Sequence, residues 1–309
     1  MKSNLVFCTT FFLLLTACAV TPAIPTVTPS PAPTATPTFT AAKFGGSDID
    51  VTYCTMNGLP QKLDVYYPKS DGPWPVFLYV HGGSWRELDK AEGAGWRYLN
   101  DSGILVVSVN YRLATSEIKF PAMIEDVMCA VRYLRAHSTR YNINPEKIGA
   151  LGASAGGHLA ALLGTADTSA GFDVGEYLDQ SSRVQAVVTM SGLSDFTQPV
   201  EGGVSMAIYF AFGALAGTNP ALLAPASPVT YVTPDDPPFL ILHGDEDGVV
   251  PIEQALTLDA KLKDAGVPST LVIVQGGDHG LNPLPGKSAE PPWEEISRII
   301  LDFLEENLL

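Results

Sequence analysis

The chain has 309 residues, of which 46% are hydrophobic and 17% are charged, so it holds enough apolar material for one catalytic-size domain with its own core. The formal net charge is −15, and no cluster of Lys and Arg occurs along the sequence. Nucleic-acid binding needs a basic surface, so the composition argues against a nucleic-acid partner.

The first segment has the features of an export signal. Lys2 precedes a short apolar run from Leu5 to Leu15. A membrane-spanning helix needs about 20 apolar residues, so this run is too short to be one. The run ends in LTAC at 15–18, which resembles the lipobox of bacterial lipoproteins. That resemblance implies a signal peptide over residues 1–17, lipid on Cys18, and a location outside the cytoplasm, at the cell surface or in the periplasm, with the membrane contacted through the lipid alone. The alternative is an ordinary secretory signal with a coincidental cysteine.

Residues 18–45 are expected to form the lipidated cysteine and a linker. From Thr21 to Ala42, proline recurs among threonine and alanine, which is typical of an extended polyproline-II-like spacer. Residues 46–309 are then the catalytic domain. Two cysteines in it, Cys54 and Cys129, form either a disulfide or two buried thiols.

The catalytic domain begins with a predicted antiparallel hairpin, in which Ile49–Tyr53 and Lys62–Tyr66 alternate around Asn57-Gly58. Apolar runs rich in Val, Ile and Leu then alternate with helical patterns, which predicts a mostly parallel eight-stranded sheet with helices on both faces. The Gly-rich apolar stretch 195–226 interrupts this alternation and is expected to form a small cap over the site. The runs predict strands at 76–80, 104–109, 148–151, 184–190, 239–242 and 271–274, and helices at 121–137, 155–164, 252–265 and 293–304.

The strongest chemical motif is GASAGG at 152–157, which directly follows a predicted strand and opens a predicted helix. A nucleophile elbow needs small residues two before and two after its serine, because the tight strand-to-helix turn brings the backbone close to itself. This context predicts Ser154 as the nucleophile. An ordinary Gly-rich turn is the alternative.

A second motif, HGGSW at 81–85, follows the strand at 76–80. Acyl transfer requires backbone N–H donors for an oxyanion, and a Gly-rich loop can supply them together with the amide of Ala155 after the nucleophile. With VNYRLA at 109–114 and FPAMIEDV at 120–127, these motifs resemble the α/β-hydrolase superfamily. The branch they resemble is the bacterial esterases grouped with feruloyl and acetyl-xylan esterases (BD-FAE-like), near the hormone-sensitive-lipase-like esterases.

The resemblance runs from about residue 48 to the C-terminus and implies the α/β-hydrolase fold. It places the remaining oxyanion donors at Gly83 and Ser84. Hormone-sensitive-lipase-like members usually have glycine where this chain has Ser84, a change that a backbone donor tolerates. Trp85, the next residue, is expected to line the substrate pocket.

The order nucleophile, acid, histidine along this fold selects the other two groups. His279 lies in a Gly-rich loop after the last predicted strand, where the general base is expected. The pattern HGxxDxxVP at 243–251 resembles the acid loop of the family and puts the acid at Asp247, with Asp245 as the alternative. His243 is expected to hold that loop.

Ser154, Asp247 and His279 predict a serine carboxylic-ester hydrolase that forms an acyl-enzyme on short-chain or carbohydrate-linked acyl esters. No cofactor and no metal are expected, since no Cys/His cluster has zinc-type spacing. The alternatives are an amidase, arylformamidase or peptidase with the same triad, and a catalytically inactive surface binding protein on the same scaffold.

Overall fold

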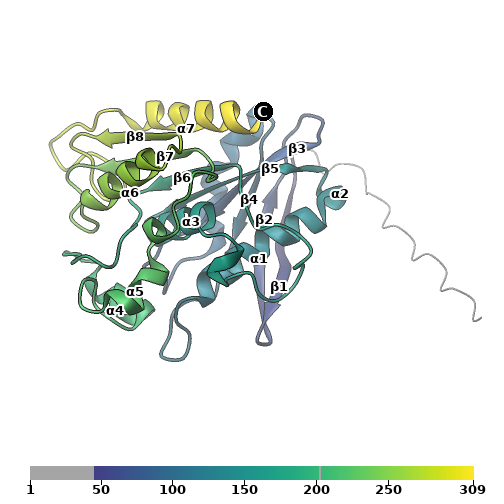
Figure 1. The fold of residues 1–309 in the computed structure, drawn as a ribbon. Coiled ribbons are helices and arrows are strands. Elements are labelled where there is room, and N and C mark those ends of the chain that lie inside the picture. Colours follow the sequence, from purple (N-terminus) through teal and green to yellow (C-terminus); the bar gives the residue numbers. More distant parts are fainter. Residues whose placement is uncertain (1–44, 202) are drawn as a thin grey trace, which may run out of the picture. The chain divides into compact units, whose positions relative to one another are not determined.

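The computed structural model describes residues 45–201 and 203–309, which form the sheet and helices of Figure 1. The expected signal peptide over residues 1–17, the lipidation site Cys18 and the linker up to residue 44 lie outside the described residues. Within the described part, no helix is both long enough and apolar enough to cross a membrane.

One sheet of eight strands organises the described chain, in the order β1-β2-β4-β3-β5-β6-β7-β8. All neighbours from β4 across to β8 are parallel, whereas β1–β2 and β2–β4 are antiparallel. This α/β-hydrolase arrangement confirms the mostly parallel sheet predicted from the sequence. The strands are β1 (Ser47–Met56), β2 (Leu59–Tyr66), β3 (Trp74–Val80), β4 (Leu105–Val109), β5 (Ile143–Ala153), β6 (Ala186–Met190), β7 (Phe239–Gly244) and β8 (Ser269–Val274).

Helices cover both faces of the sheet, as predicted (Figure 1). Successive residues of a strand point to opposite faces. In β3, Val76, Leu78 and Val80 belong to the core beneath α1, α3 and α6, whereas Phe77 and Tyr79 belong to the core beneath η1 and α7. The helices are α1 (Ala122–Ala136), α2 (Ser138–Tyr141), α3 (Ala155–Thr165), α4 (Ser205–Phe212), α5 (Pro220–Leu223), α6 (Glu253–Asp264) and α7 (Trp293–Leu308), with 3₁₀ segments η1 (Lys90–Ser102), η2 (Thr168–Ala170), η3 (Ala224–Ala226) and η4 (Pro228–Thr230).

The local sequence explains both the edge and the centre of the sheet. Asn57 and Gly58 join β1 to β2 with φ values of 52° and 78°, the left-handed pair that a tight hairpin turn of this kind needs. The central strands β3, β4, β6 and β7 are buried at every residue, because helices cover them on both sides. Their runs are therefore mostly apolar, with single buried polar residues at Ser108, Thr189 and His243, and the sequence prediction of these strands is confirmed.

The sequence patterns did not predict η1. The carboxylate of Asp89 caps the start of this 3₁₀ helix, and Gly103, with φ of 77°, ends it. Gly93 lies so close to β4 that a Cβ there would be 2.3 Å from the side chain of Ser108. The segment therefore depends on a close tertiary contact and not on a continuous helical pattern.

A disulfide joins the edge hairpin to a helix. Cys54 of β1 and Cys129 of α1 are bonded, both are buried, and they are 75 residues apart in the sequence. The sequence left open a disulfide or two buried thiols, and the structure has the disulfide. The bond closes a long loop around the first half of the sheet.

Replacing both cysteines with serine is expected to lower the free energy of unfolding by about 4 kcal/mol, because the cross-link restricts the unfolded chain over a long loop. Guanidinium unfolding with and without a reductant measures the effect. The double variant serves as its own control, since its stability must not respond to the reductant. A wild type that is equally indifferent to the reductant would contradict the prediction.

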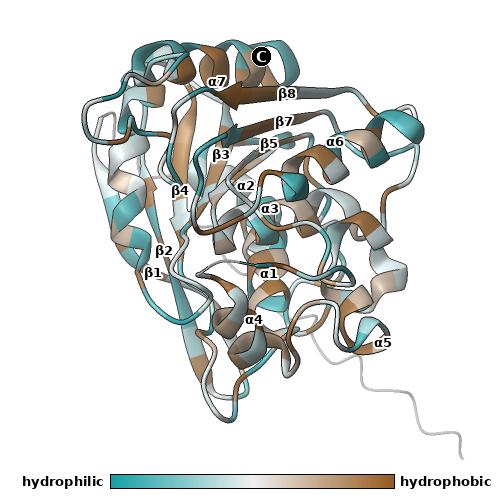
Figure 2. Ribbon diagram, turned by 90° about the vertical axis from the view of Figure 1, so that its left-hand side faces the viewer, coloured by the Kyte–Doolittle hydropathy of each residue, from teal (hydrophilic) through white to brown (hydrophobic). Residues whose placement is uncertain are grey.

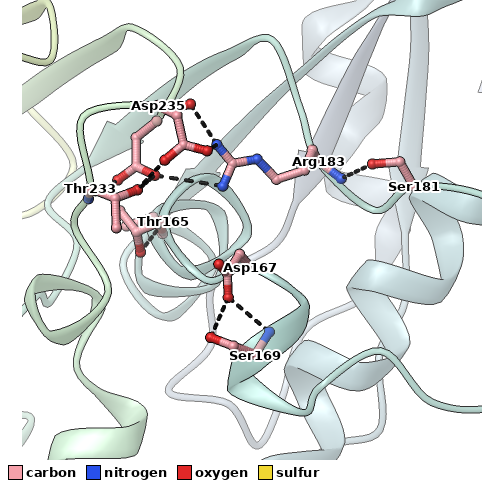
Figure 3. A network of polar contacts seen from close by, with 9 residues as sticks. Thr165, Asp167, Ser169, Ser181, Arg183, Thr233 and Asp235 are labelled. Atoms are coloured by element: carbon pink, nitrogen blue, oxygen red, sulfur yellow. Dashed lines mark hydrogen bonds and ion pairs between the residues drawn. The ribbon is translucent and has the colours of Figure 1, made fainter.

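A polar network lies at the edge of the sheet where β6 and β7 begin (Figure 3). Arg183, just before β6, donates to the main-chain oxygen of Asp235 at 2.6 Å and lies 3.6 Å from the carboxylate of Asp236, both just before β7. Ligands of such sheets bind beyond the carboxyl ends of the strands, which is the opposite edge. The network therefore joins two connecting loops and is remote from the expected site.

Candidate active site

Ser154 lies at the turn between β5 and α3. Its φ of 55° and ψ of −119° form a combination that residues other than glycine rarely adopt. A Cβ on Gly152 would lie 2.0 Å from the carbonyl oxygen of Gly156, and a Cβ on Gly156 would lie 2.0 Å from that of Val80. The turn therefore has the close backbone approach of a nucleophile elbow, at the carboxyl edge of the sheet.

The Gly156→Ala variant is expected to lose about 3 kcal/mol or more of unfolding free energy, because the added methyl group would meet backbone atoms that cannot rotate away. Gly95→Ala is the matched control, since a Cβ at Gly95 meets no atom within 4 Å. Urea unfolding of the two variants compares them. Equal stabilities would contradict the close approach at Gly156.

The structure brings Ser154, His279 and Asp247 together from the loops after β5, β8 and β7. His279 Nε2 lies 2.9 Å from Ser154 Oγ, and His279 Nδ1 lies 2.8 Å from Asp247 Oδ2. A carboxylate only accepts, so Nδ1 carries the proton and Nε2 is free to accept the serine hydroxyl. Asp245, the alternative acid, instead accepts the main-chain N–H of Gly276 at 2.6 Å.

The carboxylate of Asp247 is almost fully buried but receives several hydrogen bonds. Oδ1 accepts the main-chain N–H groups of Val249 and Val250 at 2.8 and 2.9 Å, and His243 Nε2 lies 3.3 Å from Oδ2. Burial alone would raise its pKa, but the hydrogen bonds from His243, His279 and the two amides outweigh burial and hold the pKa of Asp247 well below its usual range. The group stays ionised beside the imidazole of His279.

Two other histidines support the loops of the site. His243 Nε2 lies 3.0 Å from the main-chain oxygen of Val250, so this side chain holds the acid loop as the sequence predicted. The ring of His81 stacks on Tyr111 with centroids 4.4 Å apart, and the Tyr111 hydroxyl donates to the main-chain oxygen of Gly82 at 2.9 Å. Within residues 45–201 and 203–309, no group of three or more His, Cys, Asp or Glu side chains is placed to hold a metal ion.

The loop after β3, which we call the oxyanion loop (residues 81–85), passes beside the nucleophile. A Cβ on Gly82 would lie 3.5 Å from that of Ser154. The next three residues, Gly83, Ser84 and Trp85, have φ values of 86°, 53° and 60°. The amides of Gly83 and Ser84 are thus in a loop beside Ser154, and Ala155 opens α3; their role as oxyanion donors stays a prediction.

The structure contradicts the prediction that Trp85 lines the substrate pocket. Its indole has no exposed surface, donates from Nε1 to His158 Nδ1 at 3.1 Å, and packs edge-on against the rings of Phe196 and Phe212. The large apolar ring is buried, and its N–H finds an acceptor inside. The sequence motifs gave His158 no role. A histidine in a wholly buried helix, one turn after the nucleophile, nevertheless needs hydrogen-bond partners.

The predicted cap segment, residues 195–226, contains α4 and α5 and is described except for residue 202. Phe212 at the end of α4 lies 4.8 Å from Trp85 between ring centroids, so the segment packs beside the oxyanion loop. Most of α4 has hydrophobic residues (Figure 2). The function of the segment as a cap stays a prediction. The exposed apolar side chains are Met206, Tyr209, Phe210, Leu215 and Leu222.

Known proteins resemble this chain in both sequence and structure. The probable carboxylic ester hydrolase LipM of Mycobacterium tuberculosis is 32% identical over 217 residues, which are 67% of this chain and 50% of that protein. Esterase LipC of the same organism is 30% identical over 246 residues, 77% of this chain and 61% of that protein. The chain thus spans about half the length of the curated relatives that it matches.

A solved structure described as a truncated form of a carbohydrate esterase from gut microbiota matches with a TM-score of 0.73 and 30% identity, over 85% of this chain and 96% of that one. The family model described as BD-FAE matches residues 63–262, which include the oxyanion loop, Ser154 and Asp247. Together with the sheet order and the elbow at Ser154, this match shows that the chain belongs to the BD-FAE family.

Proposed function

We propose that this chain is a serine carboxylic-ester hydrolase that works through an acyl-enzyme. The observation that carries the proposal is the continuous hydrogen-bonded chain from Ser154 through His279 to Asp247, at 2.9 and 2.8 Å. It stands on a nucleophile elbow beside a Gly-rich loop. The esterases among the similar proteins support the same reaction class.

In the proposed reaction, His279 Nε2 takes the proton of Ser154 as Oγ attacks the ester carbonyl carbon. The carbonyl oxygen becomes an oxyanion, which accepts hydrogen bonds from the amides of Gly83, Ser84 and Ala155. His279 then gives the proton to the leaving alkoxide, and an alcohol departs. Water repeats the sequence on the acyl-enzyme and releases the acid, while the Asp247 carboxylate stabilises the charged imidazole throughout.

Fluorophosphonate labelling of the full chain in detergent, followed by peptide mass mapping, tests this reaction. Modification at Ser154 that is lost in His279→Ala supports an activated serine, because the reagent requires the imidazole to activate the hydroxyl. A folded chain that does not label would support the inactive binding scaffold instead. Faster turnover of formanilides or peptide amides than of the matching esters would support the amidase alternative.

For the substrate, we propose short-chain or carbohydrate-linked acyl esters. The gut carbohydrate esterase among the similar structures and the small size of the cap segment support this choice. A series of p-nitrophenyl esters from acetate to dodecanoate is expected to give the highest kcat/KM between acetate and hexanoate. Release of acetate or ferulate from xylan tests the carbohydrate part. Preference for dodecanoate would contradict the proposed acyl size.

For the location, we propose a lipid anchor on Cys18 and residence outside the cytoplasm. The lipobox-like sequence supports the anchor, and the disulfide between Cys54 and Cys129 is of the kind that persists in oxidising compartments. Palmitate labelling in a bacterial host is expected to be lost in Cys18→Ala and kept in Cys8→Ala, whose cysteine precedes the proposed cleavage site. Equal labelling of both variants would contradict the anchor.

A further inference from the structure

The oxyanion loop is held in a conformation that its residues do not favour by themselves. Ser84 and Trp85 have φ values of 53° and 60°, in the left-handed region where a Cβ is crowded. Such conformations persist only where neighbouring groups hold them. One holding contact is a main-chain bond, in which Ala114 donates to the carbonyl oxygen of Trp85 at 2.7 Å.

The second holding contact is the indole of Trp85. An indole N–H is only a donor, so His158 Nδ1, 3.1 Å away, is unprotonated and accepts. His158 Nε2 then carries the proton and donates to the main-chain oxygen of Ala226 at 2.7 Å. Burial lowers the pKa of His158 to about 4, so the imidazole is neutral at neutral pH and keeps Nδ1 as an acceptor.

His158 therefore links three parts of the site. It lies one turn after Ser154 on α3, and its main-chain N–H donates to the Ser154 carbonyl oxygen at 3.0 Å. Its ring reaches the oxyanion loop through Trp85 and the end of the cap segment through Ala226. The ring of Phe212 packs against both side chains, with centroid distances of 4.8 Å to Trp85 and 5.6 Å to His158.

We propose that His158 is a positioning residue for the oxyanion loop: by accepting the Trp85 indole N–H, it holds Gly83 and Ser84 where their amides face the acyl carbonyl at Ser154. The inference rests on the proposed ester hydrolysis and goes beyond it, since the ring of His158 is fully buried and acts through its bonds to Trp85 and Ala226. Loss of the bond lets the loop leave its strained conformation. The transition state is then affected more than the bound ester.

Two substitutions separate the hydrogen bonds of His158. Asparagine places its side-chain oxygen near the position of Nδ1 and can still accept from Trp85, whereas glutamine places its amide nitrogen near the position of Nε2 and can still donate to Ala226. His158→Asn is expected to keep wild-type kcat. His158→Gln, His158→Leu and Trp85→Phe are expected to lower kcat by about 10- to 100-fold with little change in KM, part of the loss seen when an oxyanion donor is removed.

An aryl trifluoromethyl ketone forms a tetrahedral oxyanion on the serine. Its inhibition constant would not change if His158 had only a packing role. It is expected to rise in parallel with the loss of kcat. The double variant Trp85→Phe/His158→Leu is expected to be no worse than either single variant, because both remove one bond. Trp74→Phe is the control: its indole N–H donates to the Ser70 carbonyl at 3.1 Å, at the other end of β3, and kcat is expected to stay unchanged.

A His158→Leu protein with wild-type kcat, or a His158→Asn protein as impaired as His158→Leu, would overturn the inference. A wild type that neither hydrolyses esters nor labels would defeat the proposed function separately. In that case the indole N–H resonance of Trp85, identified by its loss in Trp85→Phe, still decides whether His158 holds the loop. The resonance is expected to be protected from exchange in His158→Asn and unprotected in His158→Leu; equal protection in both overturns the inference.

Discussion

Ser154→Ala is expected to lower kcat for p-nitrophenyl acetate by about a million-fold and to abolish fluorophosphonate labelling. The substitution removes the Oγ that lies 2.9 Å from His279 Nε2, so neither the attack nor the acyl-enzyme is possible. Activity that remains is expected to come from the proposed oxyanion donors and from water. Since the Cβ and the main chain are kept, the free energy of unfolding is expected to change little.

Ser191→Ala is the matched control for this variant. Ser191 follows the neighbouring strand β6, is buried, and also has a positive φ, of 47°. A pre-steady-state burst of p-nitrophenol with substrate in excess of enzyme, present in the control and absent in Ser154→Ala, measures acyl-enzyme formation directly. If Ser154→Ala kept a burst, another nucleophile would have to be sought, and the proposed reaction would be wrong at its first step.

Asp247→Asn is expected to lower kcat by about ten-thousand-fold, the second largest effect. The asparagine oxygen can still accept the amides of Val249 and Val250, which leaves its NH₂ group facing His279 Nδ1. Two donors cannot share that position, so His279 turns to the tautomer with its proton on Nε2. That nitrogen can then no longer accept the proton of Ser154.

The pH dependence checks the same assignment. A carboxylate whose pKa is depressed in the folded state contributes stability that is present above its unfolded pKa, about 3.9, and is lost as pH falls through the folded value. The pKa of Asp247 lies well below its usual range, so this stability is lost only in strong acid, below about pH 4. Asp247→Asn is expected to reduce the fall of the unfolding free energy with decreasing pH below about pH 4. Above about pH 4, the pH dependence of the unfolding free energy is expected to match that of the wild type.

Asp245→Asn provides the control, because Asp245 is the other acid in this loop and bonds Gly276 instead of His279. Its kcat is expected to stay near that of wild type. Measured kcat values for the two asparagine variants, at a pH where both are folded, decide between the acids. A larger loss in Asp245→Asn would show that the catalytic carboxylate had been assigned to the wrong residue.

Local sequence was sufficient for the strands and for α1, α3, α6 and α7, but not for η1. Continuous Val, Ile and Leu runs predicted the buried strands, and Asn57-Gly58 predicted the hairpin, because turn chemistry and side-chain periodicity act over a few residues. In the motif at 152–157, Gly152 approaches the backbone of Gly156 within one strand-turn-helix unit, whereas Gly156 approaches Val80 of β3, a tertiary contact. The family resemblance added the acid loop, in which Asp247 and Asp245 were both candidates.

Only the tertiary structure decided which distant groups meet. Asp247 contacts His279 because the loops after β7 and β8 lie side by side, and Cys54 pairs with Cys129 because α1 crosses the edge hairpin. Trp85 is in the interior because His158, 73 residues later in the sequence, offers its N–H an acceptor. These contacts depend on the packing of segments that are far apart in the chain, and no short-range pattern of residues encodes that packing.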